Sequence, residues 1–216
     1  MRIDSEKIKE TIDSIEVDTH WFRRVFHTFA SSFLIYYLLP NNIVIKFIFP
    51  TVVLIFIFLF EILRLKRKID RNYFFGLRLY ENYRPASYLY FGVAAYVLLL
   101  LFPQQIAIPC ILCGCFSDPI IGELRRFLGK YEAYIVGFFI SMILFIIIWF
   151  DSDIFILFSV SVIGGLSAIY GESRSLKLFD DDFVIQIFPA FMILIFIFIL
   201  KILNIIIVFE KIIIPI

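Results

Sequence analysis

The sequence predicts an all-α, polytopic integral membrane protein with about seven transmembrane helices and a cytoplasmic N-terminus. Of its 216 residues, 62% are hydrophobic, and the mean hydropathy is +0.95, whereas soluble domains contain about 45–50% apolar residues. Several apolar runs approach or exceed the roughly 18–20 residues that cross a bilayer. The net charge of +1 gives no indication of nucleic-acid binding. No signal peptide is expected, because the first residues are charge-rich.

The predicted elements follow the apolar runs. Residues 1–18 are expected to form an amphipathic helix on the membrane surface, because Ile8, Ile12 and Ile15 recur at helical spacing among polar residues. Residues 19–216 are expected to form a single transmembrane domain. The fourth apolar run is short and contains Pro109, so it is either a span completed by packing or a broken helix. The predicted spans are 22–39, 43–63, 87–102, 106–116, 133–150, 154–170 and 183–200.

The distribution of basic residues predicts the orientation, because Lys and Arg favour the cytoplasmic side. With the N-terminus inside, 17 of the 20 lysines and arginines fall in cytoplasmic segments, and the turns at 40–42, 103–105 and 151–153 contain none. The basic loop 64–86 is expected to contact anionic membrane lipids. This orientation would place the polar segments on the cytoplasmic face.

The segment Ser117–Lys130 is the first candidate site. Asp118 followed by Pro119 is typical of a helix start, and a helix N-terminus attracts phosphate. An aspartate there would repel a phosphate unless a metal ion bridged the two, so the segment indicates a nucleotide bound with Mg²⁺. Further charged and glycine residues complete this cluster: Glu123, Arg125, Arg126, Gly129 and Lys130.

A second acidic cluster, Asp180–Asp182, directly precedes the last span. Adjacent carboxylates resist ionising together unless a cation neutralises them, and Mg²⁺ typically takes one or two carboxylates plus substrate phosphates. The alternative is a solvated acidic loop that caps the following helix at its positive end. Both interpretations stay open on this loop alone.

Two further pairs have a functional and a structural interpretation. Arg23 and His27 are four residues apart and share a helix face, so they either face a phosphate or serve as an interface arginine and an interhelical histidine. Glu61 and Arg64 end the second predicted span. They form either a local ion pair or part of a functional site, because ionisable residues within membranes often mark function.

The three cysteines, Cys110, Cys113 and Cys115, form Cys-x-x-Cys-x-Cys. Three thiols fall short of a closed four-ligand zinc site, and no histidine is nearby in the sequence. Packing residues in a membrane helix are therefore favoured over a metal or redox site.

Taken as an ordered set, these motifs resemble the dolichol kinase, phytol kinase and CTP-dependent diacylglycerol kinase family of integral-membrane lipid kinases. The resemblance covers nearly the whole chain, although each motif is short. Arg23 and His27 fit the family's Arg-x-x-x-His element, and Glu61 and Arg64 fit its Glu-x-x-Arg. The family's third element is Gly-Asp followed by Gly-(Lys/Arg)-x-x-Gly-Lys, and it is matched here by Asp118, Arg126, Gly129 and Lys130. Its fourth element is a late Glu followed by Asp-Asp-Asn, and it is matched by Glu172, Asp180 and Asp181.

Four positions depart from the family pattern. Ser117 and Arg125 replace glycines, Asp182 stands where asparagine is usual, and Gln186 stands where proline is usual. An extra carboxylate would alter metal affinity, and Arg125 would add a phosphate contact. The choice of lipid and nucleotide therefore stays open.

The resemblance implies a kinase that moves the γ-phosphoryl group of a nucleoside triphosphate, expected to be CTP, to a membrane lipid alcohol such as dolichol or another polyprenol. Such transfer needs mainly positioning and charge neutralisation. Residues 19–216 would then be a catalytic domain with its active site on the cytoplasmic face. The expected roles are catalysis by Asp118, Glu172 and Asp180, Mg²⁺ binding by Asp118, Asp181 and Asp182, nucleotide binding by Arg125, Arg126, Gly129 and Lys130, and support from Arg23, His27, Glu61 and Arg64.

Two other functions are alternatives to this one. A CTP-dependent cytidylyltransferase acting on a lipid phosphate is the second enzyme candidate, but its Lys-Asp and His-Gly-Gly-x-x-Asp-Arg signature is not found in this sequence. A transporter or non-catalytic membrane protein would place polar residues near the bilayer midplane. Lys46 and Lys201 are the only charges well inside the apolar runs. This scarcity of charge disfavours a transporter.

Overall fold

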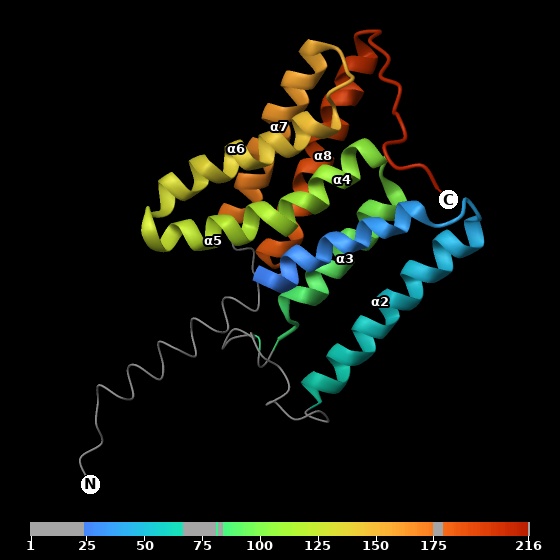
Figure 1. Cartoon of the computed structure of the whole chain (residues 1–216), viewed down its shortest axis with the longest axis vertical. Coiled ribbons are helices and arrows are strands. Elements are labelled where there is room, and N and C mark those ends of the chain that lie inside the picture. The colour runs from blue at the N-terminus through green and yellow to red at the C-terminus, as the bar shows by residue number, and fades with distance from the viewer. Residues whose placement is uncertain (1–23, 67–80, 82–83, 175–178, 216) are drawn as a thin grey trace.

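The computed structural model describes residues 24–66, 81, 84–174 and 179–215. The expected surface helix 1–18, Arg23 and most of the basic loop 64–86 lie outside the described residues. Where it is described, the chain is helical and has no strand (Figure 1). Its elements are η1 (Ala30–Leu38), α2 (Ile43–Leu65), α3 (Ser87–Leu101), α4 (Gln104–Leu112), η4 (Cys113–Ser117), α5 (Asp118–Phe127), α6 (Lys130–Ile148), α7 (Ile154–Ser173) and α8 (Asp181–Ile202).

Five helices in the described part of the chain are long and apolar enough to cross a membrane. This confirms the prediction of an all-α membrane protein, whereas seven spans and a cytoplasmic N-terminus stay predictions. α3 is apolar but has only 15 residues, and residues 24–38 form a short helix that changes from α to 3₁₀ geometry at Ala30. The five long helices are α2, the combined segment Gln104–Phe127, α6, α7 and α8.

Of the two alternatives for the fourth apolar run, 106–116, the structure favours a span completed by packing over a broken helix. The helix runs without a break from Gln104 to Phe127, which is 24 residues. Its middle part, η4, is a π-helix, a local widening that is frequent at functional sites. Pro119 lacks the N–H that would bond the carbonyl of Cys115 four residues earlier, which accounts for an irregularity at this place.

The interpretation of Asp118 and Pro119 as a free helix start is wrong. Ser117 and Asp118 both have right-handed helical backbone angles, and neither side chain caps the helix. α5 begins at Asp118 only in the sense that the hydrogen-bond pattern changes there from π to α. No open helix N-terminus is therefore available for a phosphate at this position, and most of the segment Ser117–Lys130 is helix α5.

The helix Gln104–Phe127 lies at the centre of the bundle. In its most apolar 18-residue stretch, 72% of the residues are buried, and both α6 and α8 pack against it. Small residues such as Ala107 and Gly114 allow neighbouring helices to approach closely. Cys110, Cys113 and Cys115 are buried and free, which supports their interpretation as packing residues.

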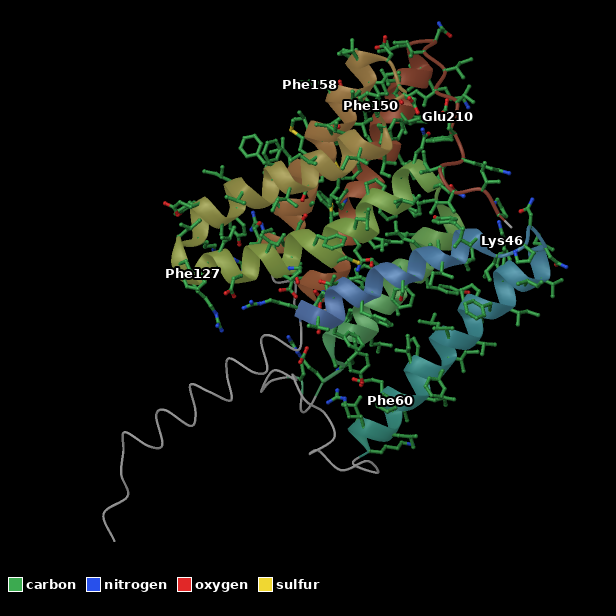
Figure 2. The ribbon with its side chains drawn as sticks, in the orientation of Figure 1. Lys46, Phe60, Phe127, Phe150, Phe158 and Glu210 are labelled. Carbon is green, nitrogen blue, oxygen red and sulfur yellow. The ribbon has the colours of Figure 1, made fainter. Side chains whose placement is uncertain are left out.

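α2 lies at the edge of the bundle, where α3 is its main partner (Figure 1). Only 6% of its most apolar stretch is buried, so its surface is suited to contact with membrane lipids. Large apolar side chains elsewhere, such as Phe127, Phe150 and Phe158, are also exposed on the outside of the bundle (Figure 2). The C-terminal segment after α8 folds back, and Gln104 and Gln105 bind its backbone.

Candidate functional site

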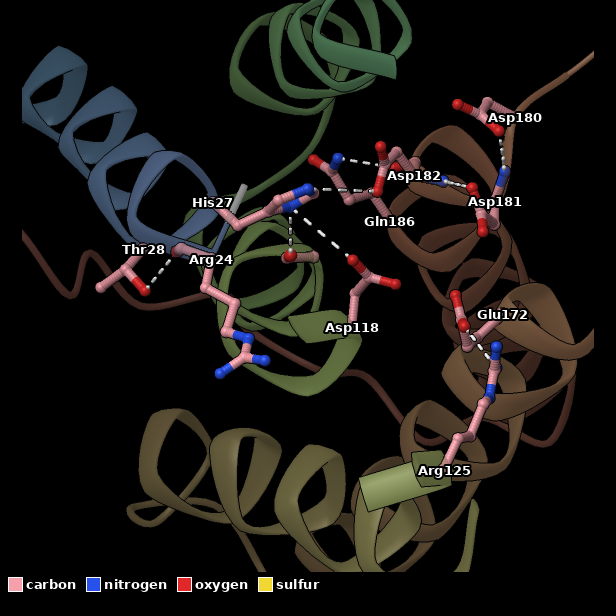
Figure 3. A network of polar contacts seen from close by, with 11 residues as sticks. Arg24, His27, Thr28, Asp118, Arg125, Glu172, Asp180, Asp181, Asp182 and Gln186 are labelled. Atoms are coloured by element: carbon pink, nitrogen blue, oxygen red, sulfur yellow. Dashed lines mark hydrogen bonds and ion pairs between the residues drawn. The ribbon is translucent and has the colours of Figure 1, made fainter. Parts of the chain in front are cut away.

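Carboxylates from three helices meet at one place in the bundle (Figure 3). Asp118 begins α5, Glu172 lies in the last turn of α7, and Asp181 begins α8. One oxygen from each of these three carboxylates lies within 4.8 Å of the others. A second group with the same spacing joins His27 to Asp118 and Asp182. We call Asp118, Glu172, Asp181, Asp182 and His27 the carboxylate cluster.

His27 lies between two of these aspartates. Its Nδ1 atom is 3.8 Å from Asp118 Oδ2, and its Nε2 atom is 3.8 Å from Asp182 Oδ1. Nδ1 also lies 3.3 Å from the carbonyl oxygen of Gly114 in η4. The imidazole therefore connects the first described helix to both sides of the cluster.

The cluster is largely buried. His27, Asp118, Glu172 and Asp182 are between 1% and 9% exposed. Burying ionised carboxylates is costly unless cations or hydrogen bonds compensate for the lost hydration. A site with this burial holds its charges in fixed positions.

Two of the three consecutive aspartates, Asp180 and Asp181, cap the start of α8, and all three form a compact oxygen group. Asp180 accepts a hydrogen bond from the backbone N–H of Asp181 at 3.2 Å, and Asp181 accepts one from the N–H of Asp182 at 3.2 Å. One oxygen from each of the three lies within 4.8 Å of the others. The capping and metal interpretations are therefore compatible in this fold.

Arg125 is the arginine that enters the site. Its Nη2 atom lies 2.5 Å from Glu172 Oε1 and donates a hydrogen bond to the hydroxyl of Tyr134 at 3.1 Å. The guanidinium also lies 4.9 Å from the centre of the Tyr134 ring. Arg125, which stands where the motif of the resembled kinases has glycine, thus places a cation against Glu172, a predicted catalytic carboxylate.

The other three predicted nucleotide-binding residues lie around the end of α5. Arg126 and Lys130 are exposed, and Lys130 Nζ is 5.9 Å from the Tyr134 ring centre, on the same tyrosine as Arg125. Gly129 has a φ of 99°, which a residue with a side chain rarely adopts, and this turn separates α5 from α6. These residues form an accessible basic edge next to Arg125.

Glu61 and Arg64 form a separate cluster at the end of α2. The Glu61 carboxylate accepts two hydrogen bonds from Arg64 and one from the backbone N–H of Ala86, and it also accepts one from the hydroxyl of Tyr88. Arg64 in turn donates to the carbonyl oxygens of Glu81 and Arg84. This buried pair fastens the chain before α3 to α2, which is a positioning role.

The carboxylate cluster has the donor chemistry that a hard divalent cation requires. Mg²⁺ prefers oxygen ligands and carboxylates in particular, and Asp118, Glu172 and Asp181 supply three of them. Glu172 Oε2 is buried and has no hydrogen-bond partner among the described residues. The residues present therefore fit a hard divalent cation, with Asp118, Glu172 and Asp181 each supplying one oxygen within 4.8 Å of the others.

Sequence reasoning missed three residues around this site. Arg24 forms an ion pair with Glu123 of α5. Gln186 is fully buried, and its side-chain amide donates to the Asp182 carbonyl oxygen at 2.8 Å. Tyr134 orients Arg125. Gln186 had a sequence signal, since it departs from the family pattern, whereas Arg24 and Tyr134 had none.

In comparisons with models of protein families, with curated proteins and with solved structures, no match to this chain was found.

Proposed function

We propose that the protein is a lipid kinase that moves the γ-phosphoryl group of a nucleoside triphosphate, with CTP as the expected donor, to the hydroxyl of a membrane lipid alcohol of the polyprenol type. The observation that carries this proposal is the meeting of Asp118, Glu172 and Asp181 beside an arginine within an apolar helical bundle. A site inside such a bundle suits an acceptor whose tail stays in the bilayer.

In this proposal the site neutralises phosphate charge, holds the nucleotide and accepts a proton. Bound Mg²⁺ would neutralise phosphate charge and so permit a triphosphate to approach the carboxylates. Arg125 holds phosphate oxygens, and Arg126 and Lys130 guide the nucleotide to the site from the exposed edge. Glu172 or Asp180 accepts the proton of the lipid hydroxyl.

The proposed reaction is a single displacement at phosphorus. The oxygen of the lipid hydroxyl forms a bond to the γ-phosphorus, and the bond from that phosphorus to the β-bridging oxygen breaks. The products are a lipid phosphate and a nucleoside diphosphate, and the hydroxyl proton passes to a carboxylate. No electrons are exchanged, so the reaction needs no redox partner.

Labelled nucleotides test this function directly. Purified protein in lipid vesicles would be incubated with Mg²⁺, a panel of lipid alcohols and lipid phosphates, and CTP or ATP labelled in the γ-phosphate or in the base. Transfer of γ-label to an alcohol supports the kinase. Transfer of cytidine to a lipid phosphate would instead indicate a cytidylyltransferase, and no transfer to any lipid would refute both.

The proposal also requires seven spans with the N-terminus and the carboxylate cluster on the cytoplasmic side. The basic residues of the sequence favour this orientation. Single cysteines placed at Arg126 and Arg174 should resist a membrane-impermeant thiol reagent in intact cells, whereas a cysteine at Asn41 should react. Labelling of Arg126 or Arg174 positions from outside would contradict the orientation.

A further inference from the structure

An apolar cavity lies between η1, α2 and α3, apart from the carboxylate cluster. Its volume is about 260 Å³, and its walls include Phe33 and Tyr36 of η1, Phe49 and Val53 of α2, and Gly92 of α3. An apolar cavity of about 150 Å³ holds one benzene ring. By that measure, this cavity holds about ten carbon atoms of a hydrocarbon chain.

The walls of the cavity suit a hydrocarbon rather than a polar group. Its lining is made almost entirely of aliphatic and aromatic residues. The hydroxyl of Tyr96 on its wall lies 3.0 Å from the hydroxyl of Thr51. This polar group is thereby satisfied, so a polar ligand would gain little from it.

The cavity opens at a rim that faces the surroundings of the bundle. Ile35 and Phe49 line it and are 57% and 52% exposed, whereas Pro50, Gly92 and Leu99 on its other walls are buried. A lipid chain can therefore enter between η1 and α2 from the bilayer. The lipid chain would not have to cross a polar surface of the protein on this path.

Continuous contacts connect this cavity to the carboxylate cluster. The ring of His27 packs edge-on against Phe91 at 5.8 Å, and Phe91 stacks on Phe33, a cavity residue, at 6.1 Å. His27 lies on one helix with the cavity residues Ser32, Phe33, Ile35 and Tyr36, which follow it by five to nine residues. Helical rises of 1.5–2.0 Å per residue place the cavity roughly 8–18 Å along the helix from His27.

We propose that this cavity binds the tail of the lipid alcohol, starting near its second isoprene unit, while the hydroxyl lies at the carboxylate cluster. The inference rests on the proposed lipid-kinase function and names the part of the protein that selects the acceptor. Leaving the bilayer for an apolar cavity brings no hydrophobic gain, because lipid tails are equally apolar. Selection therefore comes from shape, and methyl-branched tails are distinguished from straight ones by packing.

Photocrosslinking tests the cavity without any need for catalysis. A long-chain prenyl alcohol with a diazirine in its second isoprene unit would be added to the protein in vesicles and irradiated, and the labelled residues would be mapped by mass spectrometry. We expect label on η1, α2 and α3 at the cavity walls, and competition by unlabelled prenyl alcohol. A diazirine phospholipid is expected to label the outer surface of α2 instead.

A matched pair of variants on α2 sharpens the test. Val53→Trp fills the cavity from its wall, whereas Val52→Trp adds the same side chain at an adjacent position that is 57% exposed. Val53→Trp should lower crosslinking and kcat/KM for the long alcohol at least about tenfold, and Val52→Trp should change neither by more than about twofold. A short prenyl alcohol that does not reach the cavity should be phosphorylated equally by both variants.

The outcomes separate this inference from the proposed function. Kinase activity without crosslinking at the cavity overturns this inference and leaves the proposed function intact. The same holds if the diazirine phospholipid labels the cavity equally well and unlabelled prenyl alcohol does not reduce the labelling. Competed crosslinking without phosphorylation of any alcohol supports the cavity and refutes the kinase. If Val53→Trp does not fold, the wild-type competition measurement still decides the question.

Discussion

Asp118 and Asp181 lie on different helices, yet an oxygen from each carboxylate lies within 4.8 Å of the other. The central helix brings the first aspartate to this place, and the start of α8 brings the second. Glu172, at the end of α7, completes the group. Arg125 lies against Glu172 at the edge of this group, and the Glu61–Arg64 ion pair lies apart from it on α2.

Replacing either aspartate by asparagine should abolish most activity. Asp118→Asn and Asp181→Asn keep the size of each side chain but remove a charge that the proposed Mg²⁺ site needs. We expect each to lower lipid phosphorylation at least about hundredfold, with the double variant little worse than either single one. The measurement is the rate across a Mg²⁺ titration, with Asp151→Asn in a distant turn as the control. Wild-type rates for both single variants at low Mg²⁺ would show that these aspartates have only capping and surface roles.

Arg125 and Arg126 should behave differently although they are neighbours in sequence. Arg125 pairs with Glu172, whereas Arg126 is exposed. Arg125→Gln leaves a buried carboxylate without its cation and should lower kcat about tenfold or more. Arg126→Gln should mainly raise the nucleotide KM. Steady-state kinetics at saturating and limiting nucleotide separate the two effects, and equal kinetics for the two variants would contradict the geometry.

The Glu61–Arg64 pair should affect stability more than nucleotide binding. Removing one partner of a buried ion pair costs about 3–5 kcal/mol because the other charge stays buried. Glu61→Gln and Arg64→Met should therefore each lower the thermal unfolding temperature in detergent, while the nucleotide KM of the folded fraction stays unchanged. Thr28→Val, a change of an exposed hydroxyl on another helix, serves as the control. A selective loss of nucleotide affinity with normal stability would place this pair in the active site.

Two glycines near the site should respond oppositely to alanine. A Cβ atom on Gly171 would lie 2.9 Å from the backbone of Val184 in α8, so Gly171→Ala forces α7 and α8 apart beside Glu172. We expect a loss of about 1–3 kcal/mol in stability and a lower rate. Gly122→Ala in α5 has nothing within 4 Å and should stabilise the helix by up to about 1 kcal/mol. Thermal unfolding of both variants measures this contrast, and a neutral Gly171→Ala would contradict the close approach.

The three cysteines should tolerate small substitutions. All are buried and free, and none belongs to a candidate metal-binding group among the described residues. Replacing Cys110, Cys113 and Cys115 together by alanine should leave activity within about threefold, since a small residue still fits each close helix contact. Metal analysis of the purified protein is the second measurement. Complete loss of activity together with loss of a bound metal would instead indicate a thiolate site.

The sequence alone determined the class of the protein and most helix positions. Runs of Ile, Leu, Phe and Val that are long enough to cross a bilayer are stable inside a membrane, where the backbone must satisfy its own hydrogen bonds by forming a helix. The composition therefore predicted an all-α membrane protein. The helices around the predicted spans 43–63, 133–150 and 154–170 lie within a few residues of those limits. The acidic residue types at Asp118, Glu172 and Asp180–Asp182 also indicated candidate chemistry, because carboxylates beside apolar spans are costly to keep there without a partner.

The tertiary structure decided which of those residues meet. Local signals at Asp118 and Pro119 indicate a helix start, but packing of the whole segment Gln104–Phe127 against α6 and α8 keeps the helix continuous through a π-helical segment. Glu61 and Arg64 were grouped with the site by sequence, whereas their bonds hold the chain before α3. Contacts between helices depend on the rotation and crossing of each helix, and no short motif encodes these. The pairing of Arg125 with Glu172, and the place of His27 between two aspartates, could therefore be known only from the fold.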